Sequence, residues 1–130
     1  MSSQKKQGDV TVFLVEDDAF LSDIYSKKFT MEGFKVVTAD NGEKGLADIK
    51  KKMPDIVLLD ILLPKLDGFA VLEKLKADPA TKDIPVILLT NLGQKDDVDK
   101  GLQGGAVDYL IKAHFKPSEV VDKVKKVLQL

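Results

Sequence analysis

Five short segments of nearly continuous apolar residues recur along this chain of 130 residues, and a segment of helical periodicity follows each of them. A strand without polar alternation is buried on both faces, which is typical of a parallel sheet that its crossover helices cover on either side. The sequence therefore predicts a three-layer α/β sandwich with a five-stranded parallel sheet. The predicted strands are residues 10–15, 34–38, 56–59, 86–89 and 107–111.

The predicted helices differ in how strongly apolar residues anchor them. We place them at residues 18–31, 42–51, 69–76, 95–103 and 117–128. The fourth helix offers only Val98 and Leu102 as anchors, so we expect it to be the most weakly held. The first helix has an apolar set at helical spacing, which consists of Phe20, Leu21, Ile24, Tyr25 and Phe29.

Four of the predicted strands end next to polar or charged side chains: Glu16 and Asp17, then Asp60, Thr90 and Lys112. The carboxyl ends of parallel strands meet at one edge of the sheet, where open α/β sheets bind ligands. Periodicity does not fix the strand order. The flavodoxin-like order 2-1-3-4-5 would place the first and third strands side by side, so that the three carboxylates share one pocket.

The chemistry of such a pocket follows from its charges. Three carboxylates in one place repel one another, and a hard divalent cation such as Mg²⁺ relieves that repulsion. Asp60, exposed at a strand end, can attack an activated phosphorus atom and become an acyl phosphate. Transfer of this kind depends on positioning and on neutralised oxygens, which Mg²⁺ and the Lys112 ammonium would supply. The Thr90 hydroxyl can donate to a phosphoryl oxygen.

Composition narrows the class of protein. The chain has no cysteine, a formal net charge of −1 and 32% charged residues. Disulfide and thiolate chemistry are thereby excluded, and neither nucleic acid nor a membrane is favoured as a partner. No run approaches the roughly 20 apolar residues of a membrane span. We expect a cytoplasmic protein with a polar tail at residues 1–8 and one domain at residues 9–130.

Four motifs occur in a fixed order and bring together the residues named above. They are Val15-Glu16-Asp17-Asp18, then Asp60 with Pro64 and Asp67-Gly68, then Leu88-Leu89-Thr90, and finally Gly105-Ala106 before Asp108-Tyr109-Leu110-Ile111-Lys112. Any one of them is weak evidence, whereas the ordered set is specific. Over essentially its whole length the chain resembles the receiver domain of the two-component response-regulator family.

The resemblance implies a signalling switch rather than an enzyme. A sensor histidine kinase or a histidine phosphotransfer protein would donate a phosphoryl group to Asp60. Mg²⁺ would be held by Asp17 directly, by Glu16 through water, by Asp60, and by the Leu62 carbonyl.

The resemblance also implies how the signal would leave the site. Thr90 would move toward the phosphoryl group and Tyr109 would rotate inward behind it. This would alter the face formed by the predicted elements 95–103, 107–111 and 117–128. A downstream protein would bind there, and phosphorylation could promote a dimer. Because the five units fill the sequence, we expect a single-domain receiver or the N-terminal domain of a longer regulator.

Three departures from the usual family pattern stand out. Lys112 is followed by Ala113 rather than by a proline, which leaves open whether that peptide bond is cis or trans. Asn91 replaces the small residue that often follows the switch threonine, and could narrow access to the phosphoryl group. Leu62 and Leu92 occupy the two positions that often tune dephosphorylation. Neither can orient a water molecule by hydrogen bonding, so we predict a long-lived phosphoryl group.

Other functions fit less well. A haloacid-dehalogenase-like phosphatase would need a second aspartate at the position of Leu62. A flavodoxin-type cofactor binder would not place acidic residues beside a bound phosphate. A pseudo-receiver that is never phosphorylated is the more serious alternative because of Ala113 and Asn91. We interpret Asp18 as a helix cap and His114 as a loop residue.

Overall fold

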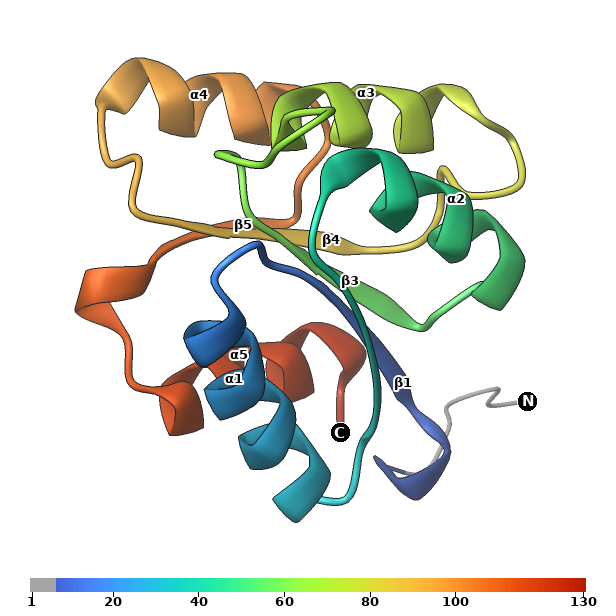
Figure 1. Ribbon diagram of the computed structural model, residues 1–130, viewed down its shortest axis with the longest axis vertical. Helices are drawn as coiled ribbons and strands as arrows, with labels where there is room; N and C mark the ends of the chain where they lie inside the picture. Colours follow the sequence, from blue (N-terminus) through green and yellow to red (C-terminus); the bar gives the residue numbers. More distant parts are fainter. Residues whose placement is uncertain (1–6) are drawn as a thin grey trace.

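The computed structural model, which describes residues 7–130, is a five-stranded parallel sheet between two layers of helices (Figure 1). The strand order is β2-β1-β3-β4-β5, so the predicted order and fold class are confirmed. The strands are β1 (Thr11–Val15), β2 (Lys35–Ala39), β3 (Ile56–Leu59), β4 (Val86–Thr90) and β5 (Asp108–Ile111).

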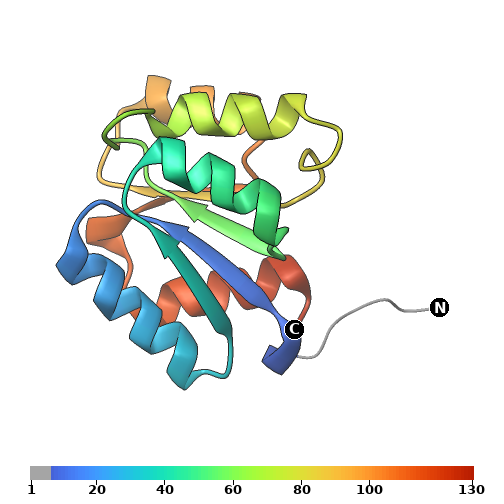
Figure 2. The same ribbon diagram turned by 45° about the vertical axis from the view of Figure 1, so that its right-hand side comes forward.

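The helices divide unequally between the two faces of the sheet. Figure 1 shows α1 and α5 on one face and α2, α3 and α4 on the other, and the turned view of Figure 2 shows the same division. Short 3-10 helices lie at Gln7–Asp9 and Lys112–His114. The α-helices are α1 (Ala19–Met31), α2 (Gly42–Lys52), α3 (Gly68–Ala77), α4 (Lys95–Gln103) and α5 (Pro117–Leu128).

The continuous apolar strands are explained by two separate cores, one on each face. Successive strand residues alternate between them: Leu58 belongs to the core under α1 and α5, whereas Val57 and Leu59 belong to the core under α2 and α3. β3 is fully buried at all four positions. Because each face has its own helices to cover it, there is no solvent side on which polar residues would be favoured.

Two predicted anchors are wrong. Phe20 is 74% exposed, because at 3.6 residues per turn it lies about 140° around the helix from the buried Tyr25. Leu102 is 45% exposed, and the one buried residue of α4 is Gly101. A methyl group at Gly101 would overlap Cδ1 of Leu88 in β4. The backbone of α4 therefore lies close to the sheet at a glycine, and Leu102 points to the side.

Most of the predicted tail at residues 1–8 lies outside the described residues, while Gln7 and Gly8 begin the first 3-10 helix. The Gln7 side-chain amide donates to the carbonyl of Glu32, at the end of α1. Within residues 7–130, no helix combines the length and the hydrophobicity that crossing a membrane would require.

Candidate functional site

The carboxyl edge of the sheet brings together the acidic residues that the sequence predicted. Val15 and Leu59 are register partners in the β1–β3 pair, so the residues that follow them, Glu16 and Asp60, are neighbours. The Asp60 amide extends this pairing by donating to the Val15 carbonyl at 3.1 Å. Carboxylate oxygens of Glu16, Asp17 and Asp60 lie within 4.8 Å of one another. The predicted shared pocket is therefore present.

Lys112, from the end of β5, bridges two of these carboxylates. Its Nζ lies 2.5 Å from Oε1 of Glu16 and 2.6 Å from Oδ2 of Asp60. The side chains of this triad are almost completely buried, with exposed fractions of 9% for Lys112, 1% for Glu16 and 7% for Asp60. The prediction that Asp60 is exposed is therefore wrong, because the Lys112 side chain and the backbone at Ile61 cover its carboxylate. The second Asp60 oxygen, Oδ1, accepts the amide of Ile61 at 2.7 Å. A cation thus already contacts the carboxylate that the sequence marks as the nucleophile.

Burial and charge oppose each other in this triad. Burial raises the pKa of Glu16, and this outweighs the lowering by Lys112 and by the Asp18 amide, which donates to Oε2 at 3.0 Å. Burial alone would lower the pKa of Lys112, but its hydrogen bonds and attraction to Asp60 and Glu16 raise it overall. The lysine therefore remains protonated, and its single positive charge faces the two carboxylates of Glu16 and Asp60.

The metal-ligating chemistry of the pocket fits a hard divalent cation. Its donors are carboxylate oxygens, and oxygen ligands of Mg²⁺ lie about 2.1 Å from the ion. The three carboxylates are already close to the separations that a single ion would require. Asp17 is exposed at the mouth of the pocket, and Leu62, whose carbonyl is the predicted fourth ligand, has a side chain that is 60% exposed.

The loop after β3 is shaped by the Asp67-Gly68 motif, for which sequence reasoning had offered no physical role. The side chain of Asp67 caps α3 by accepting the amide of Ala70 at 2.9 Å. A methyl group at Gly68 would overlap the carbonyl oxygen of Asp60 and lie 2.6 Å from Cα of Ile61. The Gly68 amide donates to the Ile61 carbonyl at 2.8 Å. Glycine therefore allows α3 to begin directly against the chain that carries Asp60.

Thr90 and Tyr109, the predicted switch residues, both contact Leu92 in the loop after β4. Thr90 is fully buried at the end of β4, and its hydroxyl oxygen accepts the amide of Leu92 at 3.3 Å. The half-buried Tyr109 donates its hydroxyl to the Leu92 carbonyl at 2.5 Å. Burial, followed by the negative charges of Asp97 and Asp60, raises the pKa of Tyr109 to about 12. The hydroxyl therefore stays a donor at neutral pH.

Two of the departures from the family pattern are in contact. No peptide bond of the described chain is cis, so the bond between Lys112 and Ala113 is trans. The Ala113 amide donates to Oδ1 of Asn91 at 3.2 Å. Sequence reasoning treated these positions separately and missed the pair, because their separation of 22 residues carries no periodic signal.

Two minor predictions can also be compared with the structure. Asp18 is the N-cap of α1, since its side chain accepts the amides of Phe20 and Leu21, as predicted. His114 is exposed, but it belongs to the 3-10 helix Lys112–His114 and not to an irregular loop, so its prediction as a loop residue is wrong.

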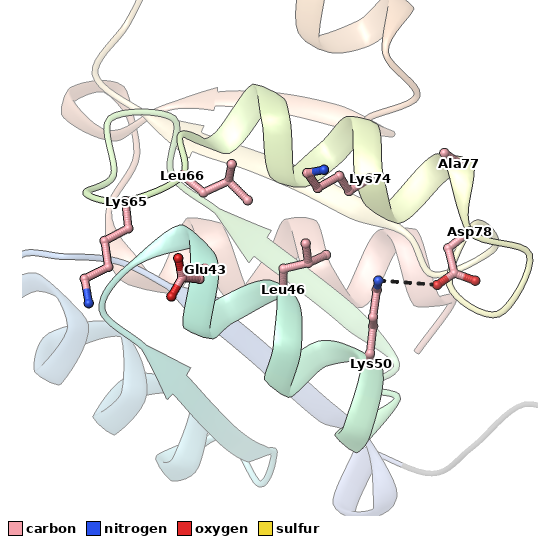
Figure 3. A pocket seen from close by; sticks show the side chains of 8 residues that line it. All are labelled: Glu43, Leu46, Lys50, Lys65, Leu66, Lys74, Ala77 and Asp78. Carbon is pink, nitrogen blue, oxygen red and sulfur yellow. Dashed lines mark ion pairs between the residues drawn. The ribbon is translucent and has the colours of Figure 1, made fainter.

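A hollow of about 530 Å³ lies elsewhere, between α2 and α3. Figure 3 shows the ion pair of Lys50 and Asp78, which are 3.6 Å apart, at one end of it and Lys65 at the other. None of the residues that line this hollow was predicted to take part in function. The acidic pocket is therefore the candidate site.

Comparison with known proteins agrees with this geometry. The family model of the response regulator receiver domain matches residues 12–125. The DNA-binding dual master transcriptional regulator RpaA of Synechocystis is 41% identical over 118 residues, which are 91% of this chain and 48% of that protein. The chain thus spans about half the length of the curated relatives it matches.

Solved structures show the same fold. A CheY-like receiver domain protein from Methanospirillum hungatei has a TM-score of 0.87 and 26% identity, with 93% of this chain and 94% of that chain covered. The complex of CheX and CheY with BeF3 and Mg²⁺ from Borrelia burgdorferi has a TM-score of 0.84 and 31% identity, with 91% and 88% covered. With a family model that matches most of its length, this chain belongs to the response regulator receiver domain family.

Proposed function

We propose that this receiver domain, at residues 9–130, is switched by a phosphoryl group that Asp60 accepts from a sensor histidine kinase or a histidine phosphotransfer protein. The observation that carries the proposal is the buried Asp60 carboxylate, which lies 2.6 Å from the Lys112 ammonium and within a cluster of three carboxylates. All of the acidic residues and the lysine are present, and the ammonium contacts both Glu16 and Asp60. This supports an active receiver over a pseudo-receiver.

Phosphoryl transfer here forms one bond and breaks one bond. An oxygen of the ionised Asp60 carboxylate bonds to phosphorus, while the donor's phosphorus–nitrogen or phosphorus–oxygen bond breaks and the donor group leaves with the electron pair. The Lys112 ammonium would bind a phosphoryl oxygen and so offset the charge that the transfer brings into the pocket. Glu16, 2.5 Å from the same ammonium, would help to hold it in place.

Mg²⁺ is the cofactor that this donor set fits. Asp17 and Asp60 would bind it directly, Glu16 through water, and the carbonyl of Leu62 would complete the protein ligands. The bound ion would supply positive charge against the phosphoryl oxygens. The Borrelia complex described above contains Mg²⁺ together with BeF3.

The output is proposed to run through Thr90 and Tyr109. Thr90 would donate its hydroxyl to the phosphoryl group, and the Leu92 amide that now contacts that hydroxyl would have to move with it. The Tyr109 hydroxyl donates to the carbonyl of the same Leu92, so a shift of Leu92 would break that bond and leave Tyr109 to rotate inward. The surface of α4, β5 and α5 would change and bind a downstream protein, or a second copy of the chain.

The proposed partners of the receiver domain are proteins and not nucleic acid. RpaA is a DNA-binding regulator of about twice this length, so the expected lack of nucleic-acid binding concerns only the receiver domain itself. We propose that the domain acts in the cytoplasm, as a switch or in a phosphorelay, and that it is not an enzyme with turnover on a separate substrate.

The phosphoryl group is expected to be long-lived. Leu62 is exposed and apolar, and Leu92 packs on the core under α2 and α3. Neither side chain can hydrogen-bond a water molecule for attack on phosphorus. Release of phosphate within seconds at neutral pH would contradict this expectation.

One experiment tests the proposal without knowledge of the partner. The protein is incubated with Mg²⁺ and acetyl phosphate, and intact masses are taken for wild type, Asp60→Asn and the control Asp122→Asn, which changes an exposed carboxylate on α5. We expect the added mass of one PO3H unit in wild type and Asp122→Asn, and none in Asp60→Asn or without Mg²⁺. The lack of an adduct in wild type, where a known receiver is modified, would favour the pseudo-receiver.

A further inference from the structure

The chains that leave β4 and β5 stay joined beyond the end of the sheet. The last register pair of these strands is Thr90 with Ile111. One residue further along β4 and two further along β5, the side chain of Asn91 accepts the backbone amide of Ala113 at 3.2 Å. This hydrogen bond connects the residue that follows Thr90 with the residue that follows Lys112.

The local structure explains why the Ala113 amide has no acceptor within its own helix. Ala113 is the second residue of the 3-10 helix Lys112–His114, and the first amides of a helix have no acceptor inside it. The residue in the N-cap position, Ile111, provides no side-chain hydrogen bond. Asn91 therefore caps this short helix from the loop after β4, as an asparagine N-cap does within one chain segment.

The position of this helix determines where Lys112 can reach. Its ammonium is at the end of a flexible four-carbon stem, yet it must lie between Glu16 and Asp60 at 2.5 and 2.6 Å. The backbone at Lys112 is the base of that stem. Any loosening of the Lys112–His114 helix would therefore spread the ammonium over more positions.

We propose that Asn91 is a positioning residue for Lys112, and that it acts through the amide of Ala113. The inference rests on the proposed phosphorylation of Asp60. Two hydrogen bonds hold the loop after Thr90: Asn91 accepts the Ala113 amide, and the Leu92 carbonyl accepts the Tyr109 hydroxyl. The first of these bonds connects the loop to the chain that carries Lys112. A proline at position 113 has no amide hydrogen and would leave Asn91 without this donor. Asn91 and Ala113 thus form a matched pair.

The test compares three variants with wild type in phosphorylation by acetyl phosphate at saturating Mg²⁺. Asn91→Ala removes the acceptor, Asn91→Asp retains it with added negative charge, and Gln94→Ala removes an exposed amide from the same loop. For Asn91→Ala we expect the first-order rate constant of phosphorylation at saturating acetyl phosphate to fall about three- to tenfold, the range that one hydrogen bond allows. Its half-saturating concentration of acetyl phosphate and its affinity for Mg²⁺ should stay within about twofold of wild type.

The conservative variant separates positioning from general damage. Asn91→Asp should restore the saturating rate constant of phosphorylation to near the wild-type value, while its charge raises the half-saturating concentration of the anionic phosphodonor. Gln94→Ala should change neither constant. Amide hydrogen exchange at Ala113 reports on the bond itself: it should speed up in Asn91→Ala and stay slow in Asn91→Asp. An unchanged saturating rate constant of phosphorylation in Asn91→Ala, or an equal loss in Gln94→Ala, would overturn the inference.

Failure of the proposed function can be told apart from failure of this inference. If wild type accepts no phosphoryl group, the phosphorylation proposal fails, while the NMR signals of the unmodified protein still test the positioning. In that case a changed ¹³Cε resonance of Lys112 in Asn91→Ala, and not in Gln94→Ala, supports the positioning role. An unchanged resonance contradicts it.

Discussion

The helices α4 and α5 flank β5 on opposite faces of the sheet and are held to it in different ways. α5 begins with a proline at Pro117, has the amide of Lys116 bound to the Glu119 carboxylate at 2.8 Å, and buries Val120, Val121 and Val124. Val127 and Leu128, which pack against the same core, extend this apolar stripe to about two turns. α5 is therefore fixed to the sheet by side-chain packing.

α4 lacks each of these features. Gln94 at its N-cap makes no side-chain hydrogen bond to the helix, and its only buried residue is Gly101. A glycine adds no apolar side chain to the core, so the contact with Leu88 and Tyr109 comes from backbone proximity. An element with few buried apolar contacts belongs to the low-stability part of a fold.

The difference indicates which half of the proposed output surface is held more weakly. Both helices border β5, but only α4 lies against the ring of Tyr109, with that ring 3.1 Å from the place of a methyl group on Gly101. A rotation of Tyr109 would therefore change the surface on which α4 packs and leave α5 in place. The variants below test this division, from the largest expected effect to the smallest.

Val124→Ala should cause the largest loss of stability. Val124 is fully buried in the core under α1 and α5. Removal of two methyl groups and the cavity left behind should cost about 2 kcal/mol of the free energy of unfolding. Urea denaturation followed by circular dichroism measures this, with the m-value as the check that unfolding remains two-state. A loss below about 0.5 kcal/mol would mean that α5 is held no better than an exposed helix.

Gly101→Ala should lower the free energy of unfolding by an intermediate amount. The added methyl group overlaps Leu88 Cδ1, which costs about 1–3 kcal/mol, while alanine favours the helix by about 1 kcal/mol. We expect a net loss of about 1 kcal/mol of stability, as α4 shifts outward. The control is Gly8→Ala, where an added methyl group meets nothing within 4 Å. An increase in stability would show that α4 accommodates the methyl group without moving.

The features that could be predicted from the sequence are those that follow from repetition. Continuous apolar strands required two covered faces, and strand ends required one shared edge, so the fold and the acidic pocket were predictable. The prediction for Phe20 was wrong although the sequence spacing from Tyr25 already placed it on a different side of the helix. The prediction for Leu102 was wrong because α4 approaches the sheet at Gly101, a tertiary contact that periodicity does not reveal. The bond between Asn91 and Ala113 was not predictable, because the path of a loop decides it.

The Tyr109 hydroxyl should lose its proton at a higher pH than an ordinary tyrosine, and it should add a small amount to the free energy of unfolding. Its pKa is raised to about 12, so between pH 10 and 12 the folded protein retains a proton that the unfolded chain releases. Stability therefore falls as the pH rises through this window and is unaffected below it. Tyr109→Phe should lose about 0.5–1 kcal/mol at neutral pH, the net value of one hydrogen bond.

Tyrosinate absorbance measured against pH separates the two tyrosines of the chain. Burial also raises the pKa of Tyr25, so the difference between wild type and Tyr109→Phe isolates the signal of Tyr109. A difference curve with its midpoint near the ordinary value of about 10 would mean that the Tyr109 hydroxyl is in water and not on Leu92.

Leu102→Ala should have the smallest effect, less than about 0.5 kcal/mol in either direction. The side chain is 45% exposed, so little apolar area is removed from the core, and alanine is at least as good a helix former as leucine. The same substitution at a true anchor of α4 would cost about 2–5 kcal/mol. Urea denaturation therefore distinguishes the two interpretations of α4 clearly. A loss of that size would restore Leu102 as the anchor that periodicity predicted, and α4 would then be fixed by packing in the same way as α5.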